Sequence, residues 1–221
     1  MPIENTSWKL RVIITSKEAL ERLRQGNDRF VSSLRDARTL TSPVRRNELV
    51  ADQAPFAIIL GCSDSRVPAE IVFDQGVGDL FVIRVAGNIV APSQVGSVEF
   101  AAERFGTQLV VVLGHSQCGA VEATLEELGR PSADQSPNLR SIVDRVRPAV
   151  EPLLETELAK SPDTLMKQAV RANIRASANH LRHGSRVLEQ LIQQQRLNVV
   201  GAEYSLDSGE VDFFDIPPTT I

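Results

Sequence analysis

Short apolar runs bounded by glycine or polar residues recur through the middle of the chain. Three of them, over 56–60, 80–85 and 109–113, are continuous and rich in valine and isoleucine. Runs of this kind are typical of strands that are buried on both faces of a sheet. The stretch over 93–105, between the second and third runs, is long enough for a crossover helix. The pattern therefore predicts parallel strands.

A helical arm is predicted at the start of the chain. Residues 15–18 have the sequence of a capping box, and apolar residues follow at roughly helical spacing over 20–34. Residues 37–54 mix threonine, serine, proline, asparagine and charged residues, which suits a loop or linker. The linker would lead from the arm into the first strand.

The second half of the chain shows a long helical pattern and then two strand patterns. A helical stretch runs over 137–195, and apolar residues over 139–150 mark one of its faces. Residues that should divide this stretch into separate helices are Pro148, Pro152, Pro162 and Gly184. A final apolar run over 197–204 turns through Asp-Ser-Gly into 211–214, which predicts a terminal hairpin.

The predicted elements make an α/β protein with a central, mostly parallel sheet flanked by helices. The chain has 221 residues and a hydrophobic content of 42%, enough for one sizeable core. We therefore expect a single domain over 1–221. Its parts are a helical arm and linker over 1–54, an α/β core over 55–130, and a helical half with the terminal hairpin over 131–221.

Charge and hydropathy argue against two classes of partner. The chain carries 24 Lys+Arg and 28 Asp+Glu, a net charge of −4, so no general attraction to nucleic acid or anionic lipid is expected. Its first residues lack the apolar region of a signal peptide, and no window reaches the roughly 18 apolar residues of a membrane span. We expect a cytoplasmic protein with neither nucleic acid nor membrane as a partner.

Each of the two cysteines comes directly after a predicted buried strand. Cys62 lies in Gly-Cys-Ser-Asp-Ser-Arg, and Cys118 lies in Gly-His-Ser-Gln-Cys-Gly together with His115. Because α/β proteins place their ligands at the carboxyl ends of strands, the two motifs are expected to meet. Cys62, His115 and Cys118 form a donor set suited to tetrahedral zinc. A redox pair is less compatible with the sequence, since neither cysteine belongs to a Cys-X-X-Cys motif.

Three protein ligands leave one position of a tetrahedral zinc ion open. Structural zinc sites normally have four protein ligands, whereas catalytic sites keep one position for water. The remaining histidines, His180 and His183, lie in a charged helical stretch and are expected at the surface. Because zinc lowers the pKa of bound water to about 7, the pattern predicts a hydrating or hydrolytic zinc enzyme.

Asp64 and Arg66 follow the first predicted ligand by two and four residues. A carboxylate held by a guanidinium can accept the proton of zinc-bound hydroxide and orient it. Asp64 could instead bind zinc as a fourth ligand, and the pair could also be an ion pair that anchors the loop. The residues alone leave these alternatives open.

The sequence Cys-Ser-Asp-Ser-Arg-Val-Pro-Ala-Glu over 62–70, followed by Gly-His-Ser-Gln-Cys-Gly over 114–119, resembles the β-class carbonic anhydrases. The similarity begins at Leu-Arg-Gln-Gly-Asn-Asp-Arg-Phe over 23–30 and continues to the terminal hairpin. It implies a zinc lyase that interconverts carbon dioxide and bicarbonate by attack of zinc-bound hydroxide.

The same resemblance implies roles for individual residues. The zinc ligands would be Cys62, His115 and Cys118, the catalytic pair Asp64 and Arg66, and the substrate-binding residues Gln53, Phe81 and Gly119. The family's N-terminal arm packs on a neighbouring subunit, which implies a homodimer or a dimer of dimers.

Two alternatives to a carbonic anhydrase stay open. The same site could hydrolyse carbonyl sulfide or carbon disulfide, which are linear isosteres of carbon dioxide. The chain could also be a non-catalytic zinc protein of the same fold. The presence of Asp64 and Arg66 argues against this second alternative, because a structural zinc ion needs no oriented hydroxide.

One position departs from family members that are regulated by bicarbonate. Those members use a tryptophan three residues before the first zinc cysteine, together with an arginine and a tyrosine. Arg84 and Tyr204 match, but Ile59 stands at the tryptophan position. We therefore expect the regulatory switch to be lost and Asp64 to remain paired with Arg66.

Overall fold

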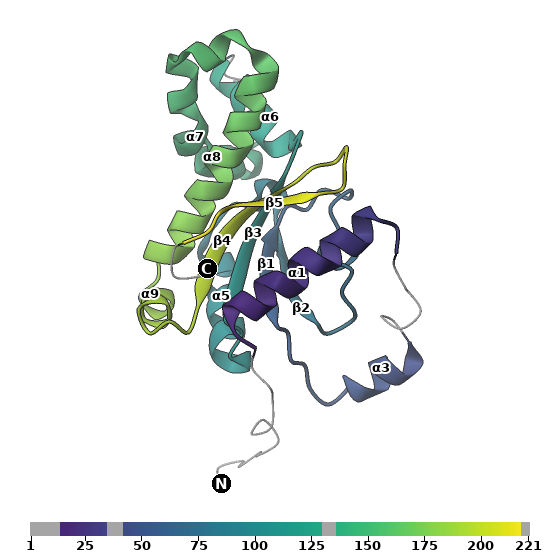
Figure 1. Ribbon diagram of the computed structural model, residues 1–221. Coiled ribbons are helices and arrows are strands. Elements are labelled where there is room, and N and C mark those ends of the chain that lie inside the picture. Colours follow the sequence, from purple (N-terminus) through teal and green to yellow (C-terminus); the bar gives the residue numbers. More distant parts are fainter. Residues whose placement is uncertain (1–13, 35–41, 130–135, 218–221) are drawn as a thin grey trace.

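The computed structural model of the chain describes residues 14–34, 42–129 and 136–217. A five-stranded sheet with the strand order β2-β1-β3-β4-β5 lies at its centre (Figure 1). The strands are β1 (Ala57–Gly61), β2 (Leu80–Arg84), β3 (Leu109–His115), β4 (Asn198–Tyr204) and β5 (Val211–Asp215). The first four are parallel, and β5 pairs antiparallel with β4. The mostly parallel sheet and the terminal hairpin are thus confirmed.

Helices precede the sheet, connect its strands and cover its two faces. They are α1 (Ser16–Val31), α3 (Pro43–Glu48), α4 (Ala69–Val72), α5 (Pro92–Phe105), α6 (Gly119–Gly129), α7 (Pro137–Val150), α8 (Pro162–His183) and α9 (Arg186–Gln193). Within the described residues, short 3-10 segments are η2 (Ala86–Asn88), η3 (Glu151–Glu155) and η4 (Glu157–Lys160). In Figure 1, α6, α7 and the first half of α8 extend beyond the end of the sheet as a helical lobe.

The strands bury both faces, because successive side chains point to opposite sides of a sheet. Every residue of β1, β3 and β4 is buried, which explains why their sequences are continuous apolar runs. Ile58 and Leu60 of β1 join a core with α5, α8 and α9, whereas Ala57 and Ile59 join a second core with α1 and α4. The sheet therefore separates two hydrophobic layers.

The predicted helix boundaries are partly correct. Pro162 begins α8, and Gly184 is its C-terminal cap residue, as the sequence predicted. Pro148 does not divide the helical stretch: it lies in the last turn of α7, which continues to Val150. A proline near the end of a helix removes one hydrogen bond without ending the helix at that residue.

The linker predicted over 37–54 contains a helix that the sequence analysis missed. Ser42 caps α3 by accepting a hydrogen bond from the Arg45 backbone N–H at 3.2 Å, and Pro43 occupies its first turn. None of the six residues of α3 is buried. A helix without a buried face leaves no hydrophobic periodicity to detect, so only its capping residues could have indicated it.

The predicted N-terminal helical arm packs on the sheet of its own chain. Helix α1 crosses one face of the sheet (Figure 1), and Ala19, Leu20 and Leu23 lie in the second core. Gly26 lies so close to the end of α4 that a Cβ atom there would be 1.9 Å from the carbonyl oxygen of Phe73, the C-cap residue of α4. Hydrophobic spacing predicted the helix correctly but does not identify the surface that receives it.

Asn27, in the C-terminal half of α1, makes three hydrogen bonds to other parts of the chain. Its side-chain amide donates to the carbonyl oxygens of Val72 at 3.1 Å and Gly209 at 2.9 Å, and its Oδ1 accepts from the Val211 N–H. The side chain is 5% exposed, so these bonds satisfy a buried polar group. Asn27 therefore ties α1 to α4 and to the turn before β5.

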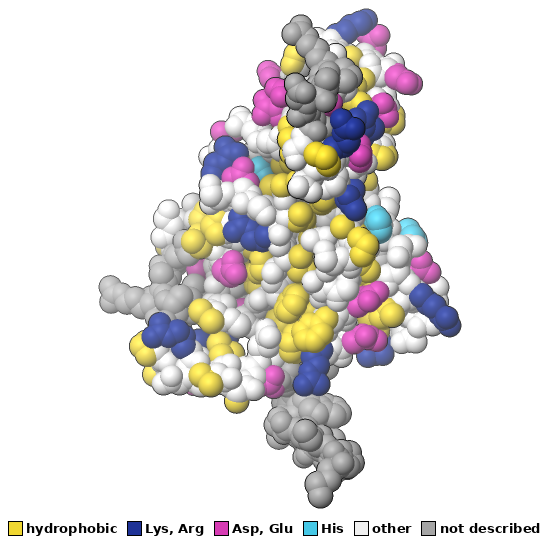
Figure 2. Space-filling model, turned by 180° about the vertical axis from the view of Figure 1, so that it is seen from behind, with side chains coloured by type: hydrophobic (Ala, Val, Ile, Leu, Met, Phe, Trp, Pro, Cys, Tyr) yellow, Lys and Arg dark blue, Asp and Glu magenta, His cyan; other side chains and the backbone are white. Residues whose placement is uncertain are grey.

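The outer surface carries mixed charges. On the face seen in Figure 2, basic and acidic side chains are interspersed with hydrophobic ones, so neither sign of charge dominates it. Among the described helices, none is long and apolar enough to cross a membrane.

Candidate metal centre and active site

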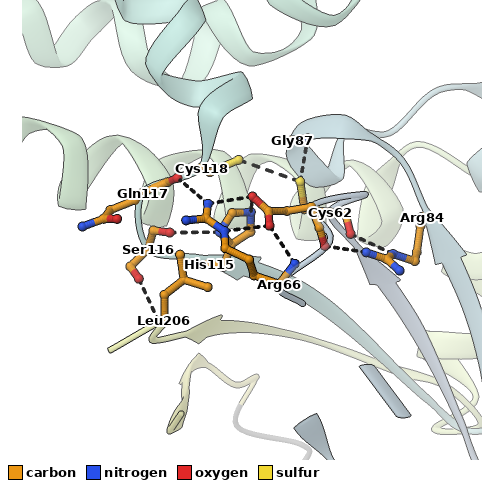
Figure 3. A network of polar contacts seen from close by, with 10 residues as sticks. Cys62, Arg66, Arg84, Gly87, His115, Ser116, Gln117, Cys118 and Leu206 are labelled. Carbon is orange, nitrogen blue, oxygen red and sulfur yellow. Dashed lines mark hydrogen bonds and ion pairs between the residues drawn. The ribbon is translucent and has the colours of Figure 1, made fainter. Parts of the chain in front are cut away.

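Two strand ends bring the predicted metal ligands together. Cys62 follows β1, His115 is the last residue of β3, and Cys118 directly precedes α6. Because β1 and β3 are adjacent and parallel, both carboxyl ends lie at the same edge of the sheet. The ligand atoms of the three residues lie within 4.8 Å of one another, and the two Sγ atoms are 4.0 Å apart (Figure 3).

The three residues fit a zinc ion in chemistry and in orientation. All three are buried, with at most 5% of any one exposed. The Nδ1 atom of His115 lies 2.9 Å from the Ser116 carbonyl oxygen, which assigns its proton to Nδ1 and leaves the lone pair on Nε2. Within the described residues, buried Nε2 makes no hydrogen bond. This is the arrangement of a metal-binding histidine, whose second nitrogen donates to a backbone carbonyl.

A hydrogen bond couples the two thiols, whose Sγ atoms are 4.0 Å apart. This bond with Cys118 lowers the pKa of Cys62, although burial acts in the opposite direction. The same hydrogen bond, together with burial, raises the pKa of Cys118. Burial acts to lower the pKa of His115, but the nearby Cys62 sulfur and its negative charge outweigh burial and raise it. A bound cation would favour two thiolates and a neutral imidazole.

Asp64 and Arg66 form a bidentate ion pair at the edge of this donor set. Arg66 Nε donates to Asp64 Oδ1 at 2.9 Å and Nη2 donates to Oδ2 at 2.8 Å; the Arg66 backbone N–H also donates to Oδ1 at 2.9 Å. These hydrogen bonds from Arg66 hold the pKa of Asp64 well below its usual range. Asp64 Oδ2 lies 3.8 Å from His115 Nε2, so an ionised oxygen faces the nitrogen of the candidate ligand.

Backbone contacts that the sequence analysis missed hold the ligand loops in place. Arg84 donates to the Cys62 carbonyl oxygen from Nε at 3.0 Å and to the Asp64 carbonyl oxygen from Nη2 at 2.6 Å. The Gly87 N–H donates to Cys62 Sγ at 3.3 Å (Figure 3). The only local signal for Gly87 is a glycine shortly after a predicted strand, which is common in turns.

A second set of contacts ties the loop of His115 to the terminal hairpin. The Ser116 N–H donates to the Tyr204 carbonyl oxygen at 3.0 Å, and the Leu206 N–H donates to Ser116 Oγ at 3.0 Å. Tyr204 and Ile59 are buried in the second core. The position of the missing tryptophan is therefore filled by an aliphatic side chain with no exposed surface.

The structure does not bring Gln53 and Phe81 to this donor set. Gln53 is exposed and precedes β1, at the opposite end of that strand from Cys62. Phe81 is in register with Ile58, which precedes Cys62 by four residues. At a rise of about 3.3 Å per residue, Phe81 lies about 13 Å along the sheet from Cys62. Gly119, in contrast, is adjacent to Cys118 and begins α6 with its surface exposed.

Comparisons with known proteins agree with this fold and donor set. The family model described as "Carbonic anhydrase" matches residues 57–211. Carbonic anhydrase 2 of Mycobacterium tuberculosis (strain ATCC 25618 / H37Rv) is 37% identical over 193 residues, covering 86% of this chain and 89% of the relative. The carbonic anhydrase of Pseudomonas aeruginosa is 35% identical over 194 residues, covering 85% of this chain and 86% of the relative.

Solved structures show the same fold. The β-carbonic anhydrase CcaA is 25% identical with a TM-score of 0.68, over 90% of this chain and 93% of that one. A tetrameric β-carbonic anhydrase of Sordaria macrospora is 21% identical with a TM-score of 0.69, over 89% of this chain and 97% of that one. The α/β fold and the Cys-His-Cys group define a metalloenzyme class. Within that class, the chain belongs to the carbonic anhydrase family of zinc lyases, in its β class.

Proposed function

We propose that the protein is a zinc carbonic anhydrase that interconverts carbon dioxide and bicarbonate. The observation that carries the proposal is the buried Cys62, His115 and Cys118 group with the ionised Asp64 carboxylate directed at it. Family membership supports the same activity. Two unoxidised cysteines that act as metal ligands also suit a reducing compartment, and we propose the cytoplasm.

Cys62, His115 and Cys118 would hold the zinc ion, with the remaining position open for water. When bound, zinc supplies a nucleophilic hydroxide near neutral pH by lowering the pKa of water to about 7. The chain's own contribution is to fix the three donors on two strand ends. The contact between His115 Nδ1 and the Ser116 carbonyl oxygen would keep the Nε2 lone pair available to the ion.

Asp64 orients the reacting water, and Arg66 orients Asp64. An ionised carboxylate only accepts hydrogen bonds, so Oδ2 would accept a hydrogen bond from the reacting water and leave a lone pair of the water oxygen free to face carbon dioxide. The bidentate contact with Arg66 keeps the carboxylate from turning. This arrangement favours the orienting role of Asp64 over the alternative of a fourth zinc ligand.

Gln53 and Phe81 would complete the site of a neighbouring copy. Both lie away from this chain's own donor set, so any substrate-binding role requires a second subunit that brings them to it. Gly119 would line the pocket of its own chain beside Cys118. We therefore propose a homodimer or a dimer of dimers, with carbon dioxide and bicarbonate as the small-molecule partners. Light scattering should show a mass of at least two chains, and an active single chain of 24.2 kDa would contradict this proposal.

The test of the proposed activity is stopped-flow hydration of carbon dioxide by the zinc-loaded protein. Hydration should be abolished when a chelator strips the metal and restored when zinc is added back. Zinc-loaded protein without hydration activity would contradict the proposal. Assays with carbonyl sulfide and carbon disulfide run in parallel, and a preference for either of these would assign the sulfur-analogue hydrolase instead.

A further inference from the structure

A backbone N–H group is directed at one of the two candidate thiolate ligands. The Gly87 N–H donates to Cys62 Sγ at 3.3 Å, and both residues are buried (Figure 3). A thiolate that accepts a hydrogen bond is held in one orientation, and part of its negative charge is drawn toward the donor. The Gly87 peptide group is therefore able to influence both the position and the donor strength of Cys62.

Gly87 has a conformation that needs support from its surroundings. Its φ angle is +69°, a left-handed value that glycine adopts freely and other residues rarely adopt. A Cβ atom at this position would lie 3.1 Å from Cβ of Ala120, in the first turn of α6 after Cys118. Glycine fits the narrow space between the two cysteine loops. Because a glycine backbone can adopt many conformations, other contacts are needed to hold the Gly87 N–H against the Cys62 sulfur.

The peptide bond that follows Gly87 is held at both of its polar ends. The Asn88 N–H donates to the Val85 carbonyl oxygen at 3.0 Å. The Gly87 carbonyl oxygen accepts a hydrogen bond from Asn173 Nδ2 at 2.8 Å. Val85 belongs to the same turn, whereas Asn173 lies 86 residues further along the chain on α8. The turn is also tied to β1, where the Val85 N–H donates to the Gly61 carbonyl oxygen at 3.1 Å. The contact from α8 is thus a long-range anchor that acts directly on the Gly87 carbonyl group.

Asn173 is a buried polar residue among apolar neighbours on its face of α8. It is 2% exposed, and its neighbours on α8 that join the first core are Ala169, Val170 and Ile174. A buried amide is costly unless it is hydrogen-bonded, and an apolar side chain of similar size would pack there without this cost. The amide at position 173 therefore makes a contact that packing of α8 against the sheet does not require.

We propose that Asn173 is a positioning residue for the Cys62 ligand. Its amide holds the Gly87 turn in place, and the Gly87 N–H in turn holds the Cys62 sulfur in its metal-binding orientation. The proposal rests on the proposed function only in requiring a metal ion on Cys62. It assigns to α8, which contributes none of the predicted ligands, a direct part in how tightly the site holds that ion.

The test compares Asn173→Leu with wild type and with Ser177→Ala. Leucine has a similar size and lacks the donor, and Ser177 lies one turn further along the same buried face of α8. Two properties are measured: the rate at which zinc is released to a chelator, and the thiolate-to-metal charge-transfer absorption of the cobalt-loaded proteins. Asn173→Leu should release zinc about 10-fold to 100-fold faster and shift the charge-transfer band, with Ser177→Ala like wild type. Wild-type release and an unshifted band in Asn173→Leu would overturn the proposal.

A measurement on the unaltered chain does not depend on whether the leucine variant folds. In protein loaded with cadmium-113, nuclear magnetic resonance should show a scalar coupling between the metal and the Gly87 amide proton, transmitted through the sulfur. A second coupling should join Asn173 Nδ2 to the Gly87 carbonyl carbon. The absence of either coupling would overturn the proposal.

The outcomes separate this inference from the proposed function. A wild-type chain that binds zinc and hydrates carbon dioxide, with Asn173→Leu unchanged in zinc release and cobalt spectrum, would overturn the positioning role alone. A wild-type chain that holds zinc through Cys62 without hydrating carbon dioxide would overturn the proposed function, while the Asn173 effect would stand. A chain that binds no metal would overturn both.

Discussion

Arg66 holds both carboxylate oxygens of Asp64, with Nε 2.9 Å from Oδ1 and Nη2 2.8 Å from Oδ2. The two residues are separated by a single serine, so the loop after β1 supplies both partners without help from another element. The guanidinium is half exposed, whereas the carboxylate side chain is only 17% exposed. Arg66 thus fixes Asp64 from the solvent side and leaves its inner edge directed at the candidate metal ligands.

This relationship predicts that Asp64→Asn separates activity from metal binding. The amide keeps the shape of the carboxylate, but it loses the ionic contact with Arg66 and presents a donor where an acceptor is needed. We expect zinc to be retained and carbon dioxide hydration to fall by about 10-fold to 100-fold or more. Elemental analysis and stopped-flow assays measure the two properties.

The matched control for this variant is Asp144→Asn. Asp144 is an exposed aspartate on α7 with its own arginine partner, Arg147, at 3.8 Å. This control should be active at the wild-type rate. If Asp64→Asn were equally active, the ion pair would only anchor the loop.

Metal content should depend on each of the three predicted ligands. Cys62→Ser, Cys118→Ser and His115→Ala each remove one donor, and the two that remain cannot complete a zinc site. We expect zinc content well below one ion per chain in all three variants by elemental analysis. His183→Ala, which removes an exposed histidine at the end of α8, serves as the control and should keep a full complement. Full zinc content in any ligand variant would remove that residue from the assignment.

The sequence was sufficient to predict the parts of the fold that follow from local pattern. The strands could be predicted because burial on both faces makes them continuous apolar runs. The donor set could be predicted because Cys62 and His115 lie at the ends of two such runs, and parallel strands bring those ends together. These inferences need only the order of residues and the geometry of a sheet.

Contacts between distant elements could not be predicted in the same way. Asn173 has no local signature, since a polar residue within a helical pattern normally indicates its solvent face. The docking of α1 depends on Gly26 and Asn27, whose partners lie on α4 and on the terminal turn. Resemblance alone indicated Gln53 and Phe81, and the single chain leaves both away from its metal ligands.

The space around two glycines predicts opposite effects of alanine substitution on the free energy of unfolding. At Gly26 a methyl group would meet the Phe73 carbonyl oxygen at 1.9 Å, and this backbone atom cannot move without displacing α4. We expect Gly26→Ala to lower the free energy of unfolding by about 1–3 kcal/mol or more. Gly96, in the interior of α5, has nothing within 4 Å of its added Cβ, so Gly96→Ala should raise it by about 0.5–1 kcal/mol. Urea denaturation measures both, and a neutral Gly26→Ala would contradict the docking of α1.

The pH dependence of activity follows from Asp64 and from Ile59. Because the pKa of Asp64 lies below its usual range, near 3.9 for an unperturbed aspartate, the carboxylate stays ionised and paired as the pH falls from 9 to about 5. The stability that the ion pair contributes is present above the unfolded-state pKa and is lost only as the pH falls toward the lower folded-state value. We therefore expect that protonation of Asp64 does not contribute to any loss of activity near neutral pH.

A bicarbonate-driven switch would be a second cause of a steep pH response, and Ile59 argues against such a switch in this chain. Its fully buried aliphatic side chain cannot donate a hydrogen bond to bicarbonate, so bicarbonate gains little preference for a state in which Asp64 leaves Arg66 for the metal. We expect the hydration rate to fall gradually below pH 8, as a single ionisation of the metal-bound water, with the same profile whether or not bicarbonate is added. A pH–rate series with and without bicarbonate measures this. A steep, cooperative loss of activity that bicarbonate enhances would show that the switch operates without the tryptophan.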